Sequence, residues 1–103
     1  MIVHLNGQLL PAEHARISPF DRGFVFGDGV YEGLRTVITP AGRPRVIGMG
    51  MHIQRMQRGL DEAGIAWDAA SIGPATTELL EANAFGVGSG REACVYWQVT
   101  RGT

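Results

Sequence analysis

Two sets of alternating residues in the sequence combine aromatic, basic and small side chains. Tyr31, Gly33 and Arg35 form the first set, and alternate residues of a strand share one face. The second set lies near the C-terminal end of the chain: Cys94, Tyr96 and Gln98. If both strands belong to one sheet, one face carries two tyrosines and an arginine around a glycine. Such a face suits a planar ring and a carboxylate, with the glycine leaving room for close approach; an ordinary solvent-facing sheet shows the same pattern.

The basic residues restrict the possible chemistry. All nine of them are arginine, so no lysine amine is available for covalent catalysis of the Schiff-base type. A compositional bias towards arginine explains the same depletion, but the chemical consequence is unchanged. Arg55, next to His52 on a helical wheel, lies outside the apolar stripe of its segment and by itself has the pattern of a surface arginine.

Other kinds of site are not supported. We expect no metal site, because the spacing of the histidines and the single cysteine does not bring them together. These residues are His4, His14, His52 and Cys94. We expect His4 and His14 at the surface. Asp28 and Glu32 are close in sequence, but alternation places Glu32 on the opposite face from Tyr31. Glycines 86, 88 and 90 follow a predicted helix and precede a strand, the reverse of a dinucleotide-binding loop.

Hydrophobic periodicity predicts the elements that position these residues. Asn6-Gly7 indicates a hairpin over residues 2–10, followed by an irregular stretch over residues 11–24. Later elements are expected as strands at 30–38, 43–47 and 91–100, a helix over 49–63 ended by Gly64, and a second helix capped by Ser71 and ended at 86–88. This order predicts an α+β fold, a mostly antiparallel sheet with two helices on one face.

Composition sets the class of protein. The chain has 103 residues, 45% of them hydrophobic and 18% charged, with a net charge of −1 and one cysteine. These values predict one soluble, cytoplasmic domain without a disulfide framework, a membrane span or an electrostatic nucleic-acid surface. The chain stops three residues after its clearest strand, and we interpret it as a fragment.

Several stretches resemble one enzyme family. The main stretch runs from Phe24 to Arg35 (FVFGDGVYEGLR), and HIQRM follows at residues 52–56; LNG at 5–7, DRG at 21–23 and VYWQVTRG at 95–102 match as well. Together they resemble the N-terminal domain of the fold-type IV pyridoxal-phosphate aminotransferases. That family includes the D-amino acid and branched-chain aminotransferases and aminodeoxychorismate lyase. The resemblance covers the whole chain.

The resemblance implies roles for individual residues. Arg55 would bind the phosphate of pyridoxal 5′-phosphate through a charge-assisted fork. The remaining residues would line the substrate pocket. Tyr31 would lie near the substrate carboxylate and Phe26 would form part of the wall. Gly33 and Arg35 would occupy positions that help set the substrate class, and Tyr96 would face the pocket from the last strand.

The family also implies what these 103 residues lack. Its Schiff-base lysine belongs to a C-terminal domain absent from this chain, so no catalytic residue is expected here and the chain alone is expected to be inactive. The expected activity of the full protein is transamination between an amino acid, with a D-amino acid such as D-alanine favoured, and a 2-oxo acid. A branched-chain L-amino acid aminotransferase and a non-catalytic binding module are the alternatives. A homodimer is expected.

Overall fold

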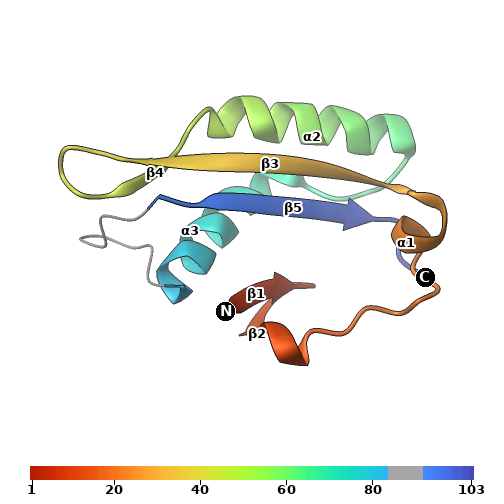
Figure 1. Cartoon of the computed structure of the whole chain (residues 1–103). Coiled ribbons are helices and arrows are strands. Elements are labelled where there is room, and N and C mark those ends of the chain that lie inside the picture. The colour runs from red at the N-terminus through yellow and green to blue at the C-terminus, as the bar shows by residue number, and fades with distance from the viewer. Residues whose placement is uncertain (84–91) are drawn as a thin grey trace.

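The computed structural model describes residues 1–83 and 92–103. Its elements, in chain order, are β1 (Ile2–Leu5), β2 (Gln8–Pro11), the 3-10 helix η1 (Ala12–His14), α1 (Arg22–Phe26), β3 (Gly29–Ile38), β4 (Pro44–Val46), α2 (Met49–Ala63), the 3-10 helix η2 (Ala69–Ser71), α3 (Ile72–Ala82) and β5 (Cys94–Thr100). Figure 1 shows α2 running alongside the long strand β3, and the hairpin β1–β2 apart from the main sheet. The predicted α+β class is confirmed.

The main sheet has three antiparallel strands in the order β4-β3-β5. Alternate residues of β3 are buried and exposed: Glu32, Leu34 and Thr36 lie in the interior and their neighbours face outwards. In β5 the same alternation buries Val95 and Trp97. One face of the sheet is therefore covered and the other is open, as the sequence pattern predicts.

Both long helices cover the same face of the sheet. Met56 and Leu60 of α2 and Ile72 and Leu80 of α3 are buried in one cluster with Leu34 and with the inward side chains of β5. The α2 helix ends where predicted, because Gly64 adopts the left-handed conformation (φ 69°) that commonly closes a helix. This packing fixes α2, and with it the position of Arg55, against β3.

The N-terminal hairpin forms a separate two-stranded sheet. Asn6 and Gly7 at its turn both have positive φ, 50° and 85°, as a type I′ turn requires. Asn83, at the end of α3, accepts a hydrogen bond from the Ile2 N–H (2.8 Å) and donates one to the Ile2 carbonyl (2.8 Å). The ring of His4 packs edge-on against Trp97, with the ring centroids 4.8 Å apart. His4 is therefore half-buried rather than a freely exposed surface residue, whereas His14 is exposed as predicted.

Several predicted boundaries differ from the structure. The last strand begins at Cys94 rather than at residue 91, because the Ala93 N–H donates to the Thr36 hydroxyl (2.7 Å) instead of to a strand carbonyl, and the strand predicted at 43–47 is limited to Pro44–Val46.

The stretch 11–24 is not wholly irregular, because Asp21 accepts a hydrogen bond from the Gly23 N–H (2.8 Å) and begins the short helix α1. Ser71 precedes α3 but does not cap it: its hydroxyl donates to the Asp68 carbonyl (2.6 Å), and the Asp68 side chain begins η2 instead. The predicted helix end at 86–88 lies outside the described residues.

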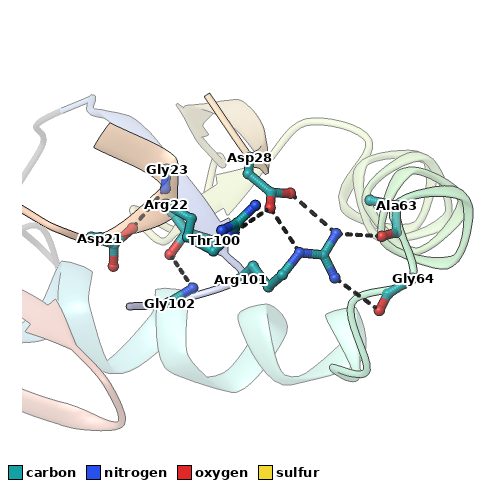
Figure 2. A network of polar contacts seen from close by, with 9 residues as sticks. All are labelled: Asp21, Arg22, Gly23, Asp28, Ala63, Gly64, Thr100, Arg101 and Gly102. Atoms are coloured by element: carbon teal, nitrogen blue, oxygen red, sulfur yellow. Dashed lines mark hydrogen bonds and ion pairs between the residues drawn. The ribbon is translucent and has the colours of Figure 1, made fainter. Parts of the chain in front are cut away.

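Asp28, at the start of β3, is the centre of a polar network (Figure 2). Its carboxylate accepts hydrogen bonds from Arg22 (3.1 Å) and from the Nε of Arg101 (2.7 Å). The pKa of Asp28 lies below its ordinary value, chiefly because of the hydrogen bond from Arg101 and then that from Arg22. Arg101 also donates to the carbonyls of Ala63 (2.6 Å) and Gly64 (3.3 Å). One arginine thus joins the end of β5 to the end of α2.

Candidate functional site

The open face of the sheet carries the aromatic pair that the sequence predicts. Gly33 of β3 is directly opposite Tyr96 of β5, and Tyr31 is opposite Gln98. The rings of Tyr31 and Tyr96 stack across the strands with centroids 5.9 Å apart and an interplanar angle of 23°. Both rings remain more than 60% exposed. The Tyr96 hydroxyl donates to the Gln98 amide oxygen (2.9 Å). The pair offers a flat aromatic surface to solvent.

Gly33 leaves open space between Tyr31 and Arg35. A Cβ atom built on Gly33 would meet no other atom within 4 Å, so the packing of this chain does not require glycine there. By contrast, a Cβ on Gly59 of α2 would come within 3.1 Å of Val30. The space above Gly33 is therefore available to a ligand or to another polypeptide. Arg35 is exposed on the same face, opposite Cys94.

Phe26 lies apart from this aromatic pair. It is the last residue of α1, is 69% exposed, and has the Arg22 guanidinium 5.0 Å above its ring. In the described part of the chain it forms no aromatic pair with Tyr31 or Tyr96. Gly27 and Asp28 connect it to the start of β3. The structure therefore brings together four of the expected substrate residues and leaves Phe26 at their margin.

Arg55 is held by a buried carboxylate on the covered side of β3. Its Nε and Nη2 donate to the two oxygens of Glu32, at 2.6 and 2.8 Å, in a bidentate pair. The Nδ1 of His52, one turn earlier on α2, lies 2.8 Å from the Glu32 oxygen that Nη2 also contacts. Glu32 is 3% exposed, whereas the Arg55 side chain is 67% exposed. The pair thus has a buried acidic end and an open basic end.

The electrostatics of this pair follow from its geometry. The pKa of Glu32 falls from 4.5 to about 2, because the hydrogen bonds from Arg55 outweigh the opposing effect of burial and His52 adds a further bond. The pKa of Arg55 is raised, first by Glu32 and more weakly by Tyr31. Both groups are therefore charged near neutral pH. The stacked Tyr31 and Tyr96 rings and the Glu32–Arg55 pair are the two halves of the candidate site.

The two halves meet at a free edge of β3. Strand β4 pairs with β3 only at Thr36 to Ile38, so residues 29–34 have no strand partner on that side in the described structure. The Tyr31 side chain lies on one side of this edge and Glu32, with its partner Arg55, on the other. A ligand at this edge could reach the aromatic face and the guanidinium together.

Arg55 has the donors that a phosphate group needs. A guanidinium carries five N–H bonds, and the pair with Glu32 uses two of them. Three remain for a ligand, on a side chain that is largely exposed. A phosphate monoester accepts such a fork well. The residues present therefore fit the phosphate of the expected cofactor.

Sequence reasoning missed the partner of Arg55. Alternation correctly separated Glu32 from Tyr31, but it gave no reason to connect Glu32 to a helix 20 residues further on. Two signals were present: Glu32 is an acidic residue on the inward side of a strand, and His52 and Arg55 are three residues apart on one helix. Together they indicate a buried ion pair.

Other kinds of site find no support in residues 1–83 and 92–103. No group of three or more histidine, cysteine, aspartate or glutamate side chains lies close enough to hold a metal ion. None of the helices in this part is long and apolar enough to cross a membrane. The glycines at 86, 88 and 90 lie outside the described residues.

Sequence comparison finds D-alanine aminotransferases among the proteins similar to this chain. No family model matches the chain. It is 28% identical over 102 residues to a D-alanine aminotransferase of Staphylococcus aureus (strain N315), covering 97% of this chain and 33% of the relative. It is 32% identical over 104 residues to a D-alanine aminotransferase of Bacillus licheniformis, covering 99% and 33%. The chain spans about one third of the length of these curated relatives.

Solved structures share the fold. A branched-chain aminotransferase from Thermoproteus uzoniensis, crystallised with norvaline, superposes with a TM-score of 0.75 at 25% identity, covering 95% of this chain and 31% of that one. The branched-chain amino acid aminotransferase of Escherichia coli has a TM-score of 0.80 at 19% identity, covering 94% and 31%. The second likeness shows the fold alone.

Proposed function

Because the chain is similar, over nearly its whole length, to the N-terminal domain of the fold-type IV aminotransferases, we propose that it forms one side of the active site of a pyridoxal-phosphate transaminase. The observation that carries the proposal is the exposed Arg55, fixed by a buried carboxylate at a strand edge that also presents a tyrosine pair. The transaminase would move an amino group between an amino acid and a 2-oxo acid.

Arg55 is the residue that would hold the cofactor phosphate. Pyridoxal phosphate, when bound, supplies an aldehyde for the substrate amine and a ring that accepts electrons. The chain contributes a positive charge and three free N–H donors at the phosphate end. The sequence contains no lysine, so the amine that anchors the cofactor must come from outside these residues.

The open face would receive the substrate. Tyr31 would lie near its carboxylate, and Tyr96 would form the neighbouring wall through the stack observed here. The empty space over Gly33 would accept part of the substrate. The exposed side chain of Arg35 would form the positively charged boundary of the pocket beyond it. Phe26 would close the pocket from α1.

A D-amino acid such as D-alanine is the favoured amino donor. This preference is supported by relatives at 28% and 32% identity that are D-alanine aminotransferases. Branched-chain L-amino acids are the second candidate, because a branched-chain enzyme shares the fold at 25% identity. Assays of the transaminase that carries this domain, with D-alanine and with L-leucine as donors to 2-oxoglutarate, separate the two. Turnover of neither would contradict the proposal.

Substitution of Arg55 tests the cofactor role. In the transaminase that carries this domain, Arg55→Ala should release pyridoxal phosphate on dialysis much faster than Arg58→Ala does. Arg58 is a matched control, since it is an exposed arginine on the same helix, three residues further on. Cofactor retention is read from the absorbance of the bound cofactor. Equal losses in both variants would place the phosphate elsewhere.

A non-catalytic binding module is the alternative from a different class, and the absence of lysine favours it. The coding sequence beyond Thr103 decides between the two. An open frame that reaches a lysine-bearing domain supports the enzyme, and a stop codon supports the module.

We also propose that the transaminase is a cytoplasmic homodimer. The expectation rests on the family resemblance, and sedimentation of the full protein as a monomer only would contradict it.

A further inference from the structure

We propose that Glu32 is a positioning residue that turns the remaining N–H donors of Arg55 outward to receive a phosphate monoester, and that His52 holds Glu32 in this orientation. The proposal rests on the proposed function, in which Arg55 binds the cofactor phosphate. Glu32 itself would not touch the cofactor.

The burial of Glu32 requires an explanation. It is the only ionisable residue among the buried side chains of the described structure, where the other buried polar residues are Thr36 and Thr76. A carboxylate in this position loses its hydration, and an apolar side chain of similar size often serves packing as well or better. Its ionic partner Arg55, meanwhile, is mostly in solvent and gains little burial. A role in fixing Arg55 accounts for both observations.

The geometry of the pair fixes the direction of the guanidinium. Two parallel hydrogen bonds, through Nε and Nη2, define the plane and the rotation of the planar group. The third contact, from His52 to a Glu32 oxygen, restrains the carboxylate in turn. The Nη1 group and the outer N–H of Nη2 then point away from Glu32. A long, exposed side chain is thereby held in one orientation before any ligand arrives.

The other arginine–carboxylate pair of this fold shows the contrast. Arg101 donates to both oxygens of Asp28, to Ala63 and to Gly64, so its Nε and both terminal nitrogens are engaged with the protein (Figure 2). That arrangement joins the end of β5 to the end of α2 and leaves few N–H donors of Arg101 free for a ligand. Arg55 has the same kind of carboxylate partner but donates to no other protein group in the described structure. Its free donors distinguish a binding group from a structural one.

The test compares variants that keep the charge but alter the geometry. Glu32→Asp retains the carboxylate and withdraws it by one methylene. His52→Ala removes the contact to Glu32, whereas His52→Asn keeps an N–H near the position of Nδ1. Pyridoxine 5′-phosphate, which carries the phosphate without the reactive aldehyde, is titrated into each 15N-labelled chain. The arginine side-chain resonances and the dissociation constant are measured, with Arg58→Lys as the control.

We expect Glu32→Asp and His52→Ala to weaken binding by about 2- to 12-fold, the effect of releasing one long side chain. The Arg55 Nε resonance should move towards that of a free arginine in both variants. His52→Asn and Arg58→Lys should bind as the unmodified chain does. In the unmodified chain the ligand should shift the Nη groups of Arg55 and leave Nε bonded to Glu32.

Two contrary results are distinguishable. Binding in Glu32→Asp and His52→Ala as tight as in the unmodified chain, with the Arg55 resonances still shifted by ligand, would overturn the positioning role alone. Failure of the ligand to shift Arg55 in the unmodified chain would overturn the cofactor role of Arg55 and the positioning role with it. If Glu32→Asp does not fold, the two His52 variants, which leave the carboxylate in place, decide the question.

Discussion

Replacing Glu32 by glutamine should destabilise the chain in a way that depends on pH. The folded pKa of Glu32, about 2, lies below its ordinary value of 4.5. A carboxylate whose pKa is lowered by folding stabilises the folded state above the unfolded pKa, and this contribution is lost as the pH falls through the folded pKa. For Glu32 the contribution is therefore complete near pH 7 and disappears between about pH 5 and pH 2.

The magnitude follows from the two pKa values. The difference between 4.5 and about 2 corresponds to about 3 kcal/mol at pH 7, an upper bound because Arg55 is exposed to solvent. Proton linkage removes about 2 kcal/mol of this by pH 3, where the unfolded chain is mostly protonated and the folded one is not. The free-energy difference between the unmodified chain and Glu32→Gln should thus shrink from about 3 to about 1 kcal/mol over this range.

Urea unfolding of both chains at pH 7 and at pH 3 measures this difference. Packing changes in the variant contribute equally at both pH values and cancel in the comparison. Glu78→Gln, at an exposed glutamate of α3, controls for general effects of losing a carboxylate. A difference that stays constant from pH 7 to pH 3 would refute the argument, because it would show that the charge of Glu32 adds nothing to stability.

Three further predictions address other contacts. Asp28→Asn should lower the melting temperature at low salt, and the deficit should narrow near 1 M salt because exposed ion pairs are screened; an equal deficit at both would argue against an ionic origin. Thr76→Val removes the acceptor of the Trp97 indole N–H (2.8 Å) and should cost about 1–3 kcal/mol in urea unfolding; less than about 0.5 kcal/mol would mean that the indole finds another acceptor. Borohydride treatment of the chain with pyridoxal phosphate should label only the amino group of Met1, since the sequence has no lysine, and an adduct on an internal residue in peptide mass spectrometry would contradict this.

The fold was largely predictable because its elements have clear periodicity. Alternation along β3 and β5 assigned the two faces of the sheet, and the spacing of the apolar residues from Met49 to Ala63 gave α2 with its actual ends. Ser71 illustrates the limit of local signals: a residue with a favourable side chain for capping bonds backwards to Asp68 instead. The 3-10 turn of η2, which directly precedes α3, engages the Ser71 hydroxyl and leaves the first turn of α3 without a side-chain cap.

The candidate site was predictable on one side of β3 only. Tyr31 and Tyr96 share a face by alternation alone, and the structure adds the stack between them. The pair of Glu32 with Arg55 depends on where α2 lies against the sheet, which is a matter of tertiary packing. The periodicity of the sequence gives no information on the distance between Glu32 and Arg55.

The attachment of the N-terminal hairpin has a consequence for the dynamics of the chain. The Asn83 side chain offers the Ile2 backbone one donor and one acceptor. It thereby makes the two hydrogen bonds that a residue of a neighbouring strand would make. Breaking these two hydrogen bonds, the contact between His4 and Trp97 and the packing of β1 against α3 would free the hairpin while α2, α3 and the three-stranded sheet stay assembled. We therefore expect the hairpin to open as a separate unit, with amide hydrogens that exchange with solvent at a lower free-energy cost than those of β3. Because the Trp97 ring contacts His4 in the closed hairpin, its fluorescence should change each time the hairpin opens.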